Sequence, residues 1–160
     1  ERGHRLVGQD DLGLLDQGLR EGLARSSIVI AATYRADTGT AEQLRLVETA
    51  RHDFPEADLL IGTAPAIEAA MALYAAGEGP ALAATYASHS VARGLAGNRV
   101  LAAPFDDPMA QGSLAVDAAQ SAIANERIGF ALHTEITVLK QGANSNAVPL
   151  SPADYFPDLE

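Results

Sequence analysis

The fold is decided by residues 98–125, NRVLAAPFDDPMAQGSLAVDAAQSAIAN, together with residues 131–141, ALHTEITVLKQ. Residues 100–103 form a short apolar run typical of a buried parallel strand, and Pro104 pushes the residue before it toward extended geometry. Asp107 is placed to cap a helix that has Pro108 at its first position. The order strand, hinge, helix, strand predicts a chain that leaves one lobe of a protein and then returns to it.

The rest of the chain alternates short apolar runs with helical patterns joined by short connections. This alternation predicts an α/β fold, a Rossmann-like open parallel sheet with helices on both faces. A weak strand is expected at residues 5–8. The expected central strands are 28–33, 59–62, 81–85 and 100–103, and the apolar run that begins at residue 81 extends to residue 86.

Two helix starts can be predicted from side-chain chemistry. Thr40 followed by Gln43 has the spacing of a capping box, with Leu44 facing inward from the helix that it starts. Thr63 is expected to cap the next helix, which should end at Gly77.

Composition excludes several classes of function. The chain has 160 residues and a net charge of −10, so it offers no basic stripe and nucleic acid is not an expected partner. No apolar run approaches the roughly 20 residues that span a bilayer, so stable membrane insertion is not expected. Cysteine is absent, which removes disulfides and thiol chemistry, and the sequence opens on polar residues without a signal peptide.

In open α/β sheets, ligands bind outside the carboxyl ends of the strands. The residues at these positions include Leu14 in the loop after the first strand, Thr63, Tyr86, Phe105 and Asp106. Two aromatic rings beside a carboxylate suit a cage for a cation, since one aromatic face stabilises a cation by about 0.5–2 kcal/mol. The alternative is that Phe105 packs under the hinge and Asp106 only supports the helix cap.

Patterns for catalysis are missing from the sequence. The four histidines are far apart and lack carboxylates at ligand spacing, so no metal site is predicted. There is no G-x-S-x-G elbow and no G-x-G-x-x-G phosphate loop, and the adjacent Ser88 and His89 do not make a dyad. We therefore expect a protein without enzymatic activity and without a cofactor.

Four blocks of sequence carry a resemblance to a known family. They are DTG at residues 37–39, QLRLVE at 43–48, IGTAPAIEAA at 61–70 and TYASHSVARGL at 85–95. With the hinge block that ends at residues 111–112, these blocks resemble type I periplasmic binding proteins, and in particular the branch of the periplasmic trimethylamine N-oxide sensor of the Tor respiratory system. That branch tends to carry an aromatic residue where this chain has Leu14, and the difference bears on the identity of the ligand.

The resemblance implies the C-terminal lobe of a two-lobed, Lac-repressor-like sugar-binding fold. It implies a ligand-binding lobe at residues 1–104, a hinge and crossover helix at 105–127, a returning strand at 128–141 and a closing crossover or tail at 142–160. It also implies a periplasmic location, a small cationic or zwitterionic ligand, and the periplasmic domain of a sensor histidine kinase as partner. The alternatives are the sugar-binding component of an ABC transporter, with its permease as partner, or a truncated lobe that acts only as an interaction domain.

The helix expected at residues 109–125 bears on that last alternative. Its apolar positions form two stripes and leave Asp117 as its only charge. A helix that is apolar on most sides is normally covered on most sides. In the family this helix packs on the other lobe, so we expect it to be under-covered here and to support a homodimer.

Overall fold

The computed structural model describes residues 4–9, 13–37, 39–75, 77–125 and 133–142, with side chains from residue 17 onward. It has five helices and six strands within these residues. In chain order they are β1 (His4–Gln9), α1 (Gly13–Leu23), β2 (Ile28–Tyr34), α2 (Thr40–Asp53), β3 (Leu59–Gly62), α3 (Ala64–Leu73), β4 (Ala81–Ala84), α4 (His89–Ala96), β5 (Ala102–Phe105), α5 (Pro108–Ile123) and β6 (Thr137–Lys140).

The strands form one sheet in the order β2-β1-β3-β4-β5-β6. The first five are parallel, which confirms the predicted α/β fold, whereas β6 pairs antiparallel with β5. The expectation that β2 is central was wrong, because β2 is an edge strand and the weakly predicted β1 lies between it and β3. The edge strand β2 is the longer apolar run, whereas β1 has only Leu6 and Val7, so the apolar character of a run does not reveal strand order.

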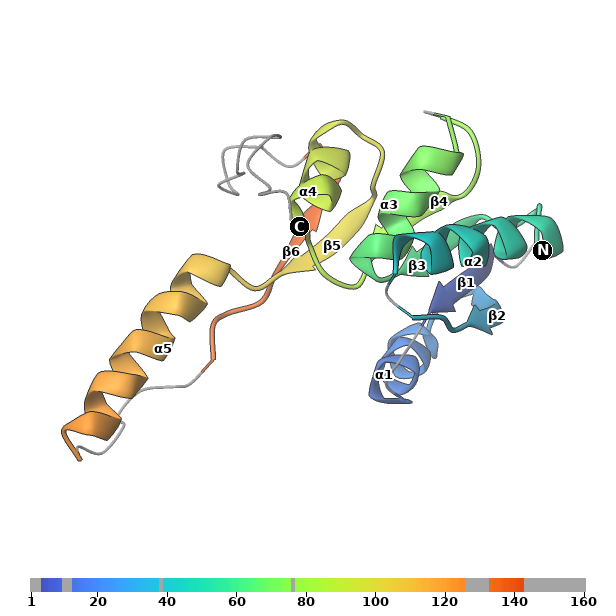
Figure 1. Cartoon of the computed structure of the whole chain (residues 1–160). Helices are drawn as coiled ribbons and strands as arrows, with labels where there is room; N and C mark the ends of the chain where they lie inside the picture. Colours follow the sequence, from blue (N-terminus) through green and yellow to red (C-terminus); the bar gives the residue numbers. More distant parts are fainter. Residues whose placement is uncertain (1–3, 10–12, 38, 76, 126–132, 143–160) are drawn as a thin grey trace.

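Helices lie on both sides of the sheet, as predicted. Along the sheet, the chain first moves from β1 to β2 at one edge and then, from β2 to β5, moves toward the other edge. Because connections between parallel strands are right-handed, this reversal places α1 on one face and α2, α3 and α4 on the other (Figure 1). The core lies under α2–α4, where Leu60 and Leu82 are buried. Their neighbours Ile61 and Ala83, which point to the other face, are only half-buried.

Several predicted helix ends need correction. Gly39, not Thr40, is the N-cap of α2, and it makes no side-chain capping bond. Gln43 does not complete a capping box, because its side chain is fully buried and its Nε2 donates to the Asp37 carbonyl. Leu44 is 36% exposed rather than inward-facing. Helix α3 ends at Leu73 with Tyr74 as its C-cap, before Gly77 is reached.

The predicted strands 81–86 and 100–103 also have different limits. Strand β4 ends at Ala84, and β5 begins two residues late and continues through Pro104. The amide of Val100 donates to the Gly94 carbonyl at the end of α4, so it does not join the sheet. Pro104 can remain in β5 because β4 pairs with β5 only at Ala102, so the missing N–H of proline removes no ladder bond on that side.

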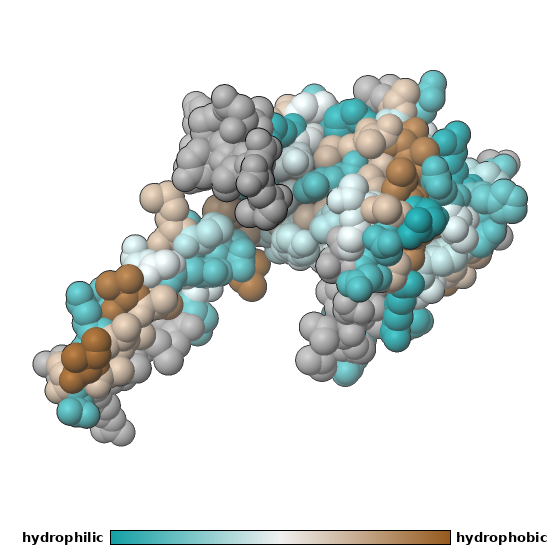
Figure 2. Space-filling view, viewed as in Figure 1, coloured by the Kyte–Doolittle hydropathy of each residue, from teal (hydrophilic) through white to brown (hydrophobic). Residues whose placement is uncertain are grey.

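Helix α5 projects away from the sheet (Figure 1) and has no buried residue. Asp107 caps it as predicted, with Oδ1 accepting from the amides of Met109 at 3.0 Å and Ala110 at 3.3 Å. Met109, Val116 and Ile123 are 70%, 56% and 83% exposed, so the helix is under-covered, as expected. Figure 2 shows hydrophobic surface along it.

Of the predicted returning strand 128–141, residues 137–140 form β6 and residues 128–132 lie outside the described residues. The predicted closing segment lies outside them from residue 143 onward. Among the helices that the structure describes, none combines the length and the apolar character needed to cross a membrane.

Candidate functional site

The carboxyl ends of β3, β4 and β5 meet along one edge of the sheet, because the three strands are parallel neighbours. Thr63 directly follows β3, and Tyr86 lies two residues beyond the end of β4. The neighbouring strands β4 and β5 pair at Ala83 and Ala102, and Phe105 is the last residue of β5. The topology therefore brings three of the predicted site residues to the same edge.

Thr63 is the N-cap of α3, as predicted, but its side chain makes no capping bond. Its Oγ1 is buried, and no described residue forms a hydrogen bond with it. A buried hydroxyl without a partner is unfavourable by roughly 1–3 kcal/mol. Thr63 therefore keeps an unused donor and acceptor at the edge where a ligand is expected.

Tyr86 is 45% exposed at this edge. Burial of part of the side chain raises the pKa of its phenol, the nearby Glu68 carboxylate raises that pKa further, and the Ala64 backbone N–H opposes the rise. A tyrosine with a raised pKa stays protonated at neutral pH. Tyr86 thus presents an aromatic ring with a hydroxyl that can donate a hydrogen bond.

The loop that carries Tyr86 is fixed by Ser88, the N-cap of α4. Ser88 Oγ accepts from the amide of Val91 at 3.1 Å and donates to Glu68 Oε1 at 2.6 Å. Glu68 was not among the residues predicted from the sequence. It lies 20 positions before Ser88, and no local pattern connects residues that far apart.

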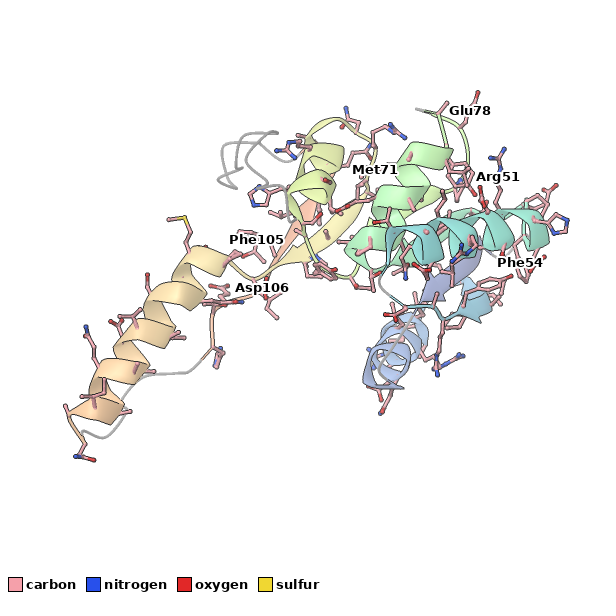
Figure 3. The ribbon with its side chains drawn as sticks, in the orientation of Figure 1. Arg51, Phe54, Met71, Glu78, Phe105 and Asp106 are labelled. Atoms are coloured by element: carbon pink, nitrogen blue, oxygen red, sulfur yellow. The ribbon has the colours of Figure 1, made fainter. Side chains whose placement is uncertain are left out.

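Phe105 and Asp106 lie at the junction of β5 and α5 (Figure 3). Phe105 is partly buried and packs against the hydrophobic core, which is the packing role considered as its alternative. Asp106 is exposed. Gln111 Nε2 donates a hydrogen bond to the Asp106 carboxylate at 2.8 Å and another to the Asp106 backbone carbonyl at 2.7 Å. The helix cap itself is made by Asp107.

Asp106 lines an open pocket of about 420 Å³ between α5 and the segment before β6. Its other lining residues are Gln111, Leu114, Ala115, Ala118, His133, Thr134 and Ile136. Thr63, Tyr86 and Phe105 are not among the lining residues, so this pocket does not bring Asp106 together with the other candidates. Leu14 lies in the first turn of α1, and its side chain is outside the described part of the structure.

No set of three or more potential metal-ligating side chains gathers within the described residues. The edge of the sheet instead offers an aromatic ring, two hydroxyls and nearby carboxylates. This combination suits reversible binding of a small polar molecule.

Comparison with solved structures defines the class of protein. A solute-binding protein of an ABC transporter from Bradyrhizobium sp. BTAi1, solved with bound bis-tris, is 28% identical with a TM-score of 0.78, over 96% of this chain and 50% of that protein. No family model matches the chain. The fold, this solute-binding protein and the relative described next support a type I periplasmic binding protein, of whose fold the chain forms one lobe.

Within that family, the chain is similar to the periplasmic protein TorT of Escherichia coli (strain K12). The two are 33% identical over 150 residues, which is 88% of this chain and 42% of TorT. The complex of the TorS sensor domain with TorT in the absence of ligand matches with a TM-score of 0.83 and 27% identity, over 98% of this chain and 55% of that one. The structure of the TorS sensor domain–TorT complex in the presence of trimethylamine N-oxide matches with a TM-score of 0.81 and 29% identity, over 96% of this chain and 53% of that one. The chain thus spans about half the length of these relatives.

Proposed function

We propose that this chain is the ligand-binding C-terminal lobe of a two-lobed periplasmic receptor. The receptor binds a small cationic or zwitterionic molecule, such as an N-methylated amine oxide. It presents the bound state to the periplasmic domain of a sensor histidine kinase. The similarity to TorT, and to its complex with the TorS sensor domain, is the observation that carries this proposal.

The chemistry of the edge supports a ligand of this kind. An exposed tyrosine ring attracts a methylated ammonium group, and its phenol can donate to an N-oxide oxygen. The buried Thr63 hydroxyl can donate as well where ligand binding exposes it. Asp106 adds negative charge beside the hinge. Leu14 supplies no aromatic surface, so Tyr86 and Phe105 are the rings that this lobe would contribute.

Calorimetric titration of the full-length protein with trimethylamine N-oxide, betaine and ribose tests the proposal. We expect the amines to bind more tightly than ribose, and Tyr86→Ala and Asp106→Asn each to weaken their binding. Glu48→Gln is a matched control for charge, because Glu48 is exposed on α2 away from the edge. Tighter binding of ribose, or unchanged binding of the amines by both variants, would contradict the proposed site. The isolated chain should bind only weakly, since it contributes one wall of the cleft.

Binding of a sugar for an ABC permease is the second candidate. The Bradyrhizobium solute-binding protein favours the ABC-transporter part of this candidate, because its identity to this chain is similar to that of the TorS-bound TorT. The two candidates also differ in partner. Retention of the ligand-loaded protein by an immobilised kinase sensor domain supports the first, and retention by a reconstituted permease supports the second.

Self-association through α5 is a proposal for the chain in isolation. Burial of one large apolar side chain contributes about 1.5–3 kcal/mol, so Met109, Val116 and Ile123 together could hold a dimer. Sedimentation equilibrium should show a concentration-dependent dimer that Val116→Asp abolishes. A monodisperse monomer at high concentration would contradict the proposal.

A further inference from the structure

The segment that presents Tyr86 has two anchors. On one side, the amide of Thr85 donates to the Gly62 carbonyl at 2.9 Å, which ties the segment to the end of β3. On the other side, Ser88 donates to the Glu68 carboxylate at 2.6 Å. The residues between the anchors, including Tyr86, belong to no helix or strand.

Glu68 is a rigid anchor because its helix is rigid. Ile67 and Ala70 are fully buried and Ala69 nearly so, which fixes α3 against the sheet around Glu68. A hydrogen bond to a carboxylate is stronger than one between neutral groups, and 2.6 Å is a short distance for an O–H donor. Ser88 also accepts from the Val91 amide, so the same hydroxyl links α3, the Tyr86 segment and the start of α4.

We propose that Glu68 is a positioning residue for the ligand site: through Ser88 it holds Tyr86 at the carboxyl edge of the sheet. The ligand part of this inference rests on the proposed function. Glu68 acts here through its hydrogen bond, and a glutamine at this position keeps an acceptor oxygen for Ser88. The conservative variant Glu68→Gln should therefore preserve what Glu68→Ala removes.

The first test needs no ligand. Amide hydrogen exchange of Val91 and the ring-carbon resonance of Tyr86, assigned with Tyr86→Phe, are followed by NMR in the 160-residue chain. Glu68→Ala should speed exchange at Val91 and shift or broaden the Tyr86 resonance. Glu68→Gln keeps an acceptor for Ser88 but loses the charge, so it should change both by less, and the exposed control Glu48→Ala should keep both close to wild type. Unchanged Val91 exchange and an unchanged Tyr86 resonance in Glu68→Ala would overturn the proposal.

The second test measures affinity for trimethylamine N-oxide in the full-length protein. Glu68→Ala should weaken binding by about tenfold, the scale of losing one hydrogen bond to a charged group, and Glu68→Gln by much less. In a Ser88→Ala background the effect of Glu68→Ala should vanish, because the shared bond is already gone. Equal weakening by Glu68→Ala and Glu68→Gln would mean that charge matters rather than position, and would overturn the inference.

The two tests separate the inference from the proposed function. If the wild-type protein binds none of the amines, the proposed function is wrong, and Val91 exchange still decides whether Glu68 holds the segment. If the amines bind but Glu68→Ala binds them as well as wild type, the positioning role alone is wrong.

Discussion

Gly94 in α4 lies where the helix packs most closely on its neighbours. A Cβ placed on it would lie 2.6 Å from Met71 Sδ and 2.7 Å from Val100 Cγ2. Both distances are shorter than real carbon contacts allow, so one neighbour must move. Met71 is flexible, but Val100 is fully buried and its branched side chain is stiff, so we expect Gly94→Ala to strain the core.

The size of the effect follows from two opposing contributions. Alanine is favoured over glycine within a helix by about 1 kcal/mol, and overpacking a core costs about 1–3 kcal/mol. With Val100 unable to yield, the variant should lose about 1 kcal/mol of unfolding free energy. Gly18→Ala is the matched control, because Gly18 lies within α1 with nothing within 4 Å of its added Cβ. It should gain up to about 1 kcal/mol.

Urea denaturation followed by circular dichroism measures both variants against wild type. The two substitutions should therefore separate by about 2 kcal/mol, with opposite signs. In thermal unfolding, each 1 kcal/mol corresponds to a shift of about 2–4 °C for a chain of this size. If Gly94→Ala stabilises the protein as much as Gly18→Ala does, the close packing of α4 on Met71 and Val100 is not what the structure indicates.

Three further predictions concern single interactions. Asp107→Ala should speed hydrogen exchange of the first amides of α5 and destabilise that helix by about 1 kcal/mol; unchanged exchange would mean that the cap contributes nothing. Arg99→Met should lower the unfolding free energy by about 2 kcal/mol in urea denaturation, because it removes two hydrogen bonds from the guanidinium to carbonyls at the end of α3; a smaller effect than Arg25→Met, an exposed control, would contradict this. Burial raises the pKa of Tyr34 to about 12, and the hydrogen bond to Asp53 and the negative charge of Asp53 add to this rise. The contribution of the protonated Tyr34 to stability is therefore full below pH 10 and is lost as the pH rises through about 12. Asp53→Asn should lower that pKa in an ultraviolet titration of the phenols, and an unchanged curve would exclude the interaction.

The alternation of strands and helices was predictable because each element has its own local signal. Apolar runs marked β2, β3 and β4, and Asp107 before Pro108 marked the start of α5. The ends of elements were harder to predict. Val100 is as apolar as a strand residue, but its amide bonds to the end of α4, a partner that becomes visible only after the chain folds.

The candidate site shows the same limit. Topology alone brings Thr63, Tyr86 and Phe105 to one edge, because parallel strands end together. The side-chain partners at that edge are not local in sequence, as Glu68 and Ser88 show. Sequence patterns therefore predicted which residues share this edge but not which contacts hold them in place.

The exposed stripe on α5 and the edge of the sheet call for different kinds of partner. Helix α5 has 16 residues and is therefore about 24 Å long. Its exposed apolar residues recur at seven-residue intervals along that length, so only a surface of similar length can cover them. A molecule the size of trimethylamine N-oxide cannot do so, whereas it does match one tyrosine ring and a few hydroxyls. Covering α5 and binding a ligand are thus separate events, and a variant such as Val116→Asp should abolish association of the isolated chain without changing the residues at the edge that would contact the ligand.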